Sequence, residues 1–258
     1  MKLAILGCMA AAAFALTTVH DVEEHIEKLV EASEPLMEEK LRLHLAGLKP
    51  DRSCDEKKFV DSLNKFYDAL GLKPIRNKRQ IARKTRALIV ADGIEGYRTL
   101  AKHILAYEKD MKDNFGCFYP KNLYNLGYPI HHILGVTLSV ANSIVMAHTV
   151  EDLADDYSCA VKTGMDTHAE VIYLINRGLY AALRSGKDKC KLASLYIKLM
   201  VGIYKQECGE SVANFVYGQI ATPFSILFKQ CRLPAPPKKP KGGLDDNPAD
   251  VQTMKQFF

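Results

Sequence analysis

The chain has 258 residues, of which 48% are hydrophobic, so it is long enough to bury a substantial core as a single domain. Its formal net charge of +5 is a mild excess that is not typical of a nucleic-acid-binding protein, and we expect no nucleic-acid partner.

The first fifteen residues, MKLAILGCMAAAAFA, have the features of a secretory signal peptide. They contain one positive charge, an apolar run and a small-x-small ending at Ala13-Phe14-Ala15. The apolar run is too short to span the roughly 30 Å of hydrocarbon in a membrane. We therefore expect cleavage after Ala15 and a secreted protein that begins at Leu16.

The N-terminal half of the mature chain is predicted to be helical, because its apolar residues recur at helical spacing. Amphipathic helices are expected over 18–32, from Pro35 to about 48, and over 53–70, where Gly71 and Pro74 end the segment. A further helix is expected to be interrupted around Asp92-Gly93 and followed by one that buries Ile94 to Met111. Residues 86–93, RALIVADG, could alternatively form a strand.

Residues 113–129 combine aromatic residues with turn formers, which predicts a loop packed down on the core. The segment that follows, 130–150, is strongly apolar, and no Lys, Arg, Asp or Glu occurs from 122 to 150. Such a segment is either a membrane span or the central helix of a bundle. Four polar residues in it are unfavourable in hydrocarbon, and a span would place one flanking cysteine in a reducing cytosol, so we favour the buried helix. The four are His131, His132, Asn142 and His148.

The C-terminal half is predicted to form helices over 130–163, 166–185, 188–205 and 211–230, with Asp166 capping the second and Pro223 kinking the fourth. From 232 to 258 the composition is rich in Pro and Lys, which predicts a flexible tail. Residues 16–231 are thus predicted to be one all-α domain. We expect a disulfide-braced bundle of about seven to eight helices around the central apolar helix.

Six cysteines remain after the signal peptide, and an even number in a secreted chain predicts three disulfides. Very short turns between the last four helices force them to be antiparallel neighbours. This places Cys159 at the same end as Cys208, and Cys190 at the same end as Cys231. By elimination, Cys54 pairs with Cys117.

A stripe of small residues marks the central helix as a candidate ligand site. Gly135, Ser139, Ser143 and Ala147 recur every four residues, and Asn142 lies beside them. Either a neighbouring helix packs closely on this stripe or a hydrophobic ligand does.

An acidic cluster follows the apolar segment and suggests a metal site. On a continuous helix, His148, Asp152 and either Asp155 or Asp156 share one face, which gives an imidazole and two carboxylates for a divalent cation. The alternative is a solvated acidic helix end with a satisfied histidine.

A basic cluster lies in the N-terminal half of the chain, and it has two functional interpretations beside that of a solvated helix start. Arg76-Asn77-Lys78-Arg79 resembles a furin-type processing site. Alternatively, the cluster binds an anionic polymer or lipid surface. Its residues are Arg76, Lys78, Arg79, Arg83, Lys84 and Arg86.

The sequence contains no catalytic signature, so a binding function is the first expectation. A secreted, disulfide-braced, all-helical protein with an apolar centre resembles carriers that hold a small hydrophobic, lipid-like ligand between helices. The first alternative is a secreted interaction or effector protein that acts through its basic surface. The second is a divalent-metal-dependent enzyme that uses the region of His148 and Asp152.

Overall fold

The computed structural model describes residues 54–71, 87, 89, 91–128, 130–184, 188–228 and 230–237. Within these ranges the regular structure is helical throughout and contains no strand, which confirms the all-α prediction. The predicted signal peptide, the two helices before residue 50 and the basic cluster at 76–86 lie outside the described residues.

Two helices of the N-terminal half match the sequence pattern closely. Helix α3 (Glu56–Ala69) starts at Asp55, whose side chain accepts a hydrogen bond from the backbone N–H of Lys58, and it ends before Gly71, which has a positive φ. Helix α5 (Ile94–Met111) starts after Gly93. Residues 87, 89, 91 and 92 are helical, so the strand alternative for this segment is wrong at these positions.

The aromatic segment after α5 packs against the core, as predicted, but it forms two short helices. These are the 3₁₀ turn η1 (Phe115–Phe118) and helix α6 (Pro120–Asn125). Phe115, Phe118 and Tyr128 are buried. Asn114 fixes the segment to the start of α3, because its amide exchanges two hydrogen bonds with the backbone of Asp55 at 2.6 and 2.9 Å.

The central apolar helix is shorter than predicted. Helix α7 (Ile130–Ala154) ends before a turn, and α8 (Tyr157–Lys162) follows as a separate helix. The break occurs because Asp156 has a non-helical backbone and its carboxylate accepts from the backbone N–H of Cys159 at 3.1 Å, which makes it an N-cap. A π-turn, η2 (Thr163–Thr167), leads into α9 (Ala169–Arg184), so Asp166 is not the cap of that helix.

Helix α10 (Lys189–Leu227) contains the last two predicted helices, which run as two antiparallel arms. The break between the arms is at Gly209, whose φ of 83° and ψ of −177° are not helical. Only glycine adopts this conformation readily, which explains the sharp turn. Pro223 lies inside the second arm, where a kink was predicted. The residue of α10 whose dihedral angles depart from helical values is Gly209, so the sharp break is at the glycine and not at the proline.

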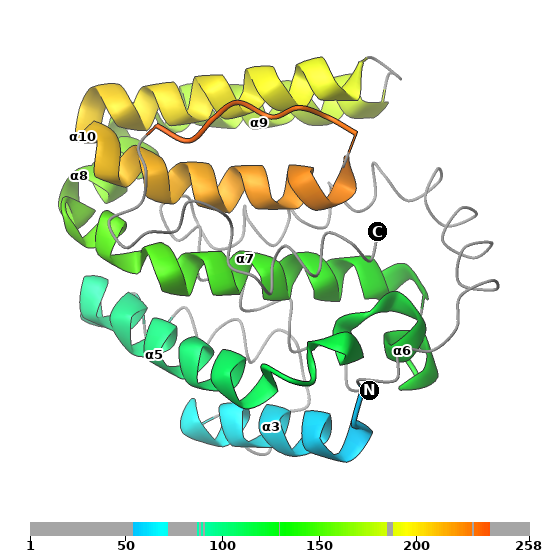
Figure 1. Ribbon diagram of the computed structural model, residues 1–258. Coiled ribbons are helices and arrows are strands. Elements are labelled where there is room, and N and C mark those ends of the chain that lie inside the picture. The colour runs from blue at the N-terminus through cyan, green and yellow to red at the C-terminus, as the bar shows by residue number, and fades with distance from the viewer. Residues whose placement is uncertain are drawn as a thin grey trace.

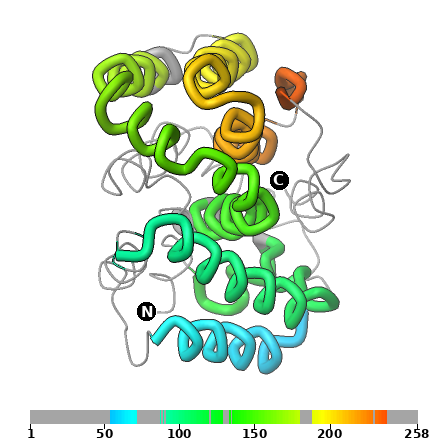
Figure 2. Tube along the Cα trace, turned by 90° about the vertical axis from the view of Figure 1, so that its left-hand side faces the viewer, coloured from blue at the N-terminus to red at the C-terminus, as the bar shows by residue number. Residues whose placement is uncertain are grey.

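The helices stack as layers on either side of α7 (Figure 1). Helix α9 and the first arm of α10 lie side by side at the top, followed downwards by the second arm, α7, α5 and α3, and the view along the stack shows the same order (Figure 2). The core therefore follows α7 along both of its packed faces. No helix in the described part of the chain is long and apolar enough to cross a membrane.

All three predicted disulfides are confirmed. Cys54 bonds to Cys117, Cys159 to Cys208 and Cys190 to Cys231. The last of these joins the two ends of the α10 hairpin. Residues 232–237, at the start of the predicted tail, have no regular structure, but Leu233 packs on the core and the carbonyl of Pro234 accepts from the hydroxyl of Tyr217 at 2.7 Å.

Gly218 is where α10 comes closest to α7. A Cβ built on this glycine would lie 2.7 Å from Cγ1 of Val145. We expect Gly218→Ala to lower the free energy of unfolding by about 1–2 kcal/mol, because overpacking outweighs the gain of about 1 kcal/mol in helix propensity. Urea unfolding of G218A and of the double variant V145A/G218A checks this. Adding V145A to G218A should recover stability, and a further loss would contradict the close approach.

Buried tyrosines make the fold sensitive to alkaline pH. Burial raises the pKa of Tyr128 to about 12 and holds the pKa of Tyr107 and Tyr204 well above the usual value near 10. These groups stay neutral in the folded state but ionise in the unfolded chain, so stability is complete below pH 10 and is lost as pH rises towards 12 and beyond. Urea unfolding at pH 9, 10 and 11 should show this decline. Tyr107→Phe should make the decline less steep, and an unchanged slope would contradict this assignment.

Candidate ligand-binding site

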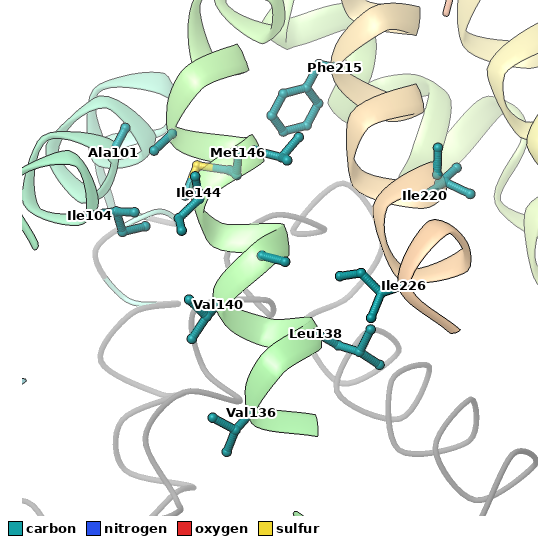
Figure 3. Packing of buried hydrophobic residues seen from close by; sticks show 14 of the residues in the cluster. Ala101, Ile104, Val136, Leu138, Val140, Ile144, Met146, Phe215, Ile220 and Ile226 are labelled. Carbon is teal, nitrogen blue, oxygen red and sulfur yellow. The ribbon is translucent and has the colours of Figure 1, made fainter. Parts of the chain in front are cut away.

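Helix α7 packs against a different helix on each of two faces. Towards α5, Nε2 of His148 lies 2.8 Å from a carboxylate oxygen of Glu108, and Glu151 pairs with Arg98 at 2.7 Å. The Arg98 guanidinium holds the pKa of the Glu151 carboxyl below its usual range. Ile144 and Val140 point to the same side, where Figure 3 shows Ala101 and Ile104 of α5.

The other face of α7 meets the second arm of α10. The amide of Asn214 donates to the carboxylate of Asp152 at 3.1 Å, and Gly218 lies against Val145. Numbers therefore rise along one helix as they fall along the other, so the two helices are antiparallel. Figure 3 shows Leu138 and Ile226 pointing towards one another farther along this contact.

The side chains beside this contact can be placed by helical rotation, at about 100° a residue. On α7, Ser139, Asn142 and Met146 lie about 60–120° round from Val145. On α10, Phe215 and Gln219 are turned by about 60–100° from Gly218 in the same sense. In an antiparallel pair these rotations point to the same side. We call these five residues the buried seam.

The buried seam holds polar atoms that have no hydrogen-bond partner. Asn142, Ser139 and Gln219 are at most 1% exposed, yet both amide atoms of Asn142, both of Gln219 and the hydroxyl of Ser139 are unpaired. A buried polar group left unpaired costs about 1–3 kcal/mol. Such atoms are rare in folded proteins and call for an explanation such as a bound molecule or an ordered water.

The other buried amides in the described part of the chain are paired, which sets the buried seam apart. Asn114 bonds to Asp55, Asn122 donates to the carbonyl of Gly116 at 2.9 Å, and Asn214 bonds to Asp152. The unpaired amides of the protein's described core are thus concentrated where α7 and α10 meet.

Only part of the predicted stripe of small residues lies on the side of α7 that carries the buried seam. Each step of four residues turns the stripe by about 40°, so it rotates by about 120° between Gly135 and Ala147. Gly135 and Ser139 lie on the side of Asn142, whereas Ser143 and Ala147 are turned away from α10. Ser143 is satisfied, since its hydroxyl donates to the carbonyl of Ser139 at 2.8 Å.

Close helix packing occurs at Gly218 rather than at the glycine of the stripe. A Cβ on Gly135 would meet no atom within 4 Å, so this residue borders open space. Ser139 and Ser143 are fully buried, and Ala147 nearly so. The stripe was expected to contact either a neighbouring helix or a hydrophobic ligand. At Gly135 the structure gives no support for contact with a helix.

Three of the four residues of the suggested metal site bond to separate partners. His148 pairs with Glu108, Asp152 accepts from Asn214, and Asp156 caps α8. Asp155 lies in the turn that ends α7, so the continuous helix on which the hypothesis relied is not formed. Among the residues that the structure describes, no three His, Cys, Asp or Glu side chains gather to hold a metal ion.

A depression of about 330 Å³ between α3 and α5, lined mostly by charged residues, is the other feature of interest. Aspartate and lysine side chains line it in similar numbers, and Lys65 pairs with Asp110 across it at 3.3 Å. It contains no unpaired buried atom, and its charges balance, so it lacks the mark that distinguishes the buried seam.

Gln219 is the residue of the site that sequence reasoning missed. It occupies a buried position in the apolar pattern of the second arm, at helical spacing from Val212, Phe215 and Ile226. A single polar residue at such a position is the signal that could have found it.

Comparisons of the chain with known protein families, curated proteins and solved structures find no match.

Proposed function

We propose that the protein is a helical carrier that holds a small hydrophobic, lipid-like molecule with a polar head group beside the contact of α7 and α10. The observation that carries this is the fully buried and unpaired amide of Asn142. The amides of Asn142 and Gln219 each offer a donor and an acceptor, which suits a carboxyl, amide or hydroxyl head group. Of the residues that the sequence suggests, Gly135, Ser139 and Asn142 are assigned as ligand contacts, and Gln219 is added. Ser143 and Ala147 are left out because they are turned away from α10.

The surroundings support a ligand that is mostly apolar. Ile133, Met146 and Phe215 are fully buried, and the apolar chain of a ligand would pack among side chains of this kind. The few polar atoms would fix the orientation of the head group and distinguish it from a plain hydrocarbon. A hydrocarbon would leave those atoms unpaired and is therefore predicted to bind more weakly.

Binding of a fluorescent fatty acid, followed by its emission and by competition with unlabelled fatty acids and fatty alcohols, tests the proposal. Wild-type protein should bind the probe at one site, and Asn142→Leu should weaken binding about tenfold, which corresponds to the loss of one buried hydrogen bond of about 1.4 kcal/mol. Leu105→Ser, on the exposed side of α5, is the matched control. Equal binding by N142L and wild type would refute the assigned site.

We further propose that the protein is secreted. Three disulfides tie the described helices together, and such bonds persist in oxidising compartments. Mass spectrometry of protein collected from the medium of its source cells should find an N-terminus at Leu16. Intact residues 1–15 on the collected protein would contradict the proposed signal peptide.

A further inference from the structure

Large apolar side chains are exposed mainly on α9 and the first arm of α10. Eight such residues are exposed in the described part of the chain, and six of them lie between residues 165 and 199. Single exposed apolar residues are ordinary, but a contiguous group marks an interaction surface. The six are Met165, Val171, Tyr173, Leu174, Leu195 and Leu199.

Five of the six come from two helices that lie side by side, and Met165 lies in η2 just before α9. The hydroxyl of Tyr196 on α10 donates to Asn176 on α9 at 2.7 Å, and both views show these helices as the outermost layer (Figures 1 and 2). Leu195 and Leu199 are four residues apart and share one helix face. They are 55% and 44% exposed, although leucine normally gains from burial.

The same part of the chain is basic. From 169 to 208, which covers α9 and the first arm of α10, there are seven Lys and Arg residues against three acidic residues, Glu170, Asp188 and Glu207. The formal charge of this span is +4, so its surface attracts anions.

A row of lysines runs beside the exposed leucines. Lys191, Lys198 and Lys205 recur every seven residues, which places them along one edge of the leucine face, and all three are exposed. Lys191 lies 3.8 Å from Asp188, and Lys205 lies 2.8 Å from Glu210. Both pairs are on the surface, where ion pairs contribute little and exchange readily for other anions.

We propose that this layer, which we call the α9–α10 face, binds the surface of a membrane that contains anionic lipids. Leu195, Leu199 and Leu174 enter the boundary between head groups and acyl chains, and the lysines contact the lipid phosphates. Charge complementarity favours this occupant over a second copy of the chain, because two faces of charge +4 would repel each other. The inference is independent of the ligand proposed beside α7.

Sedimentation with phosphatidylcholine vesicles, with and without 30% phosphatidylserine, tests the α9–α10 face in the full chain. Wild-type protein should bind the anionic vesicles and bind pure phosphatidylcholine at least about tenfold more weakly. The variant L195S/L199S should lose about tenfold or more in partition, and so should K191E/K198E/K205E. Each site is exposed, and circular dichroism of the variants checks that the helices remain.

The matched controls are Leu105→Ser and K102E/K109E/K112E, which change the same residue types on and just after α5. K102E/K109E/K112E changes the total charge as much as K191E/K198E/K205E does, and both controls should keep wild-type binding. Failure of the wild type to bind anionic vesicles, or equal loss in the controls, would overturn the proposal. It would also be overturned if L195S/L199S bound anionic vesicles as the wild type does, because the protein would then adhere by charge alone. A third contradicting result would be light scattering that shows a dimer for the wild type and a monomer for L195S/L199S, because the face would then be a contact between copies of the chain.

Discussion

Replacing Asn142 by Leu is expected to raise the free energy of unfolding of the ligand-free protein by about 1–3 kcal/mol. The reason is that both amide atoms of Asn142 are buried without a partner, so the wild-type protein bears a desolvation cost that leucine, of similar size, does not. Gln219→Met should act in the same direction. Urea unfolding of delipidated protein measures both effects.

Asn214→Leu is the matched control for this prediction. Asn214 is also a buried amide at the contact of α7 and α10, but it donates to the buried carboxylate of Asp152 at 3.1 Å. Its loss leaves that carboxylate with one bond fewer, so stability should fall by about 1–3 kcal/mol. Opposite signs for N142L and N214L would follow from the pairing seen in the structure. A destabilised N142L protein would show that the amide of Asn142 is satisfied in solution.

The combination of higher stability with lost binding is the expected signature of a ligand site. Polar groups that are unpaired in the free protein are retained in evolution when function needs them, and removing them then stabilises the fold at the expense of activity. A residue with a purely structural role would show a loss of stability and no specific loss of binding.

Removal of the bond between Cys54 and Cys117 in the variant C54A/C117A is expected to lower the free energy of unfolding by about 4 kcal/mol. This bond closes a loop of 63 residues, and the entropy that it removes from the unfolded chain corresponds to about this amount. It also anchors α3, whose buried face consists mainly of Phe59, Leu63 and Phe66. Thermal unfolding and hydrogen exchange of the variant measure the two consequences.

Hydrogen exchange should show where the loss is felt. In C54A/C117A the amides of α3 should exchange faster than those of α7, because α3 forms the outer layer of the stack and packs mainly on α5 (Figure 1). The variant C190A/C231A provides the contrast, since it should loosen the α10 hairpin and leave α3 protected. Equal acceleration in α3 for both variants would contradict this division of roles.

The cysteine pairs could be predicted from the sequence because the argument needed only the helix order and the shortness of the turns. Antiparallel neighbours place Cys159 near Cys208 whatever the detailed packing is. The burial of residues 136–147 followed equally directly from the absence of charge. Both depend on coarse patterns that tertiary contacts do not alter.

The end of α7 could not be predicted, because an aspartate in a helix and an aspartate that caps a helix look alike in sequence. Asp156 caps α8. Because α7 ends before this cap, His148, Asp152 and the two following aspartates do not share one helix face, and the metal hypothesis relied on that face. The unpaired state of Asn142 and Gln219 was likewise hidden, since it depends on how α7 and α10 are rotated against each other. Gly218 sets that contact, and nothing in its sequence context marks it as more important than the other glycines.

Native mass spectrometry of the protein purified from its own source tests the carrier proposal most directly. Wild-type protein should retain one lipid-like molecule of a few hundred daltons that organic solvent removes, and N142L/Q219M purified in the same way should lack it. Wild-type protein that carries no such molecule, and that also fails to take up fatty acids or fatty alcohols after incubation, would contradict the account.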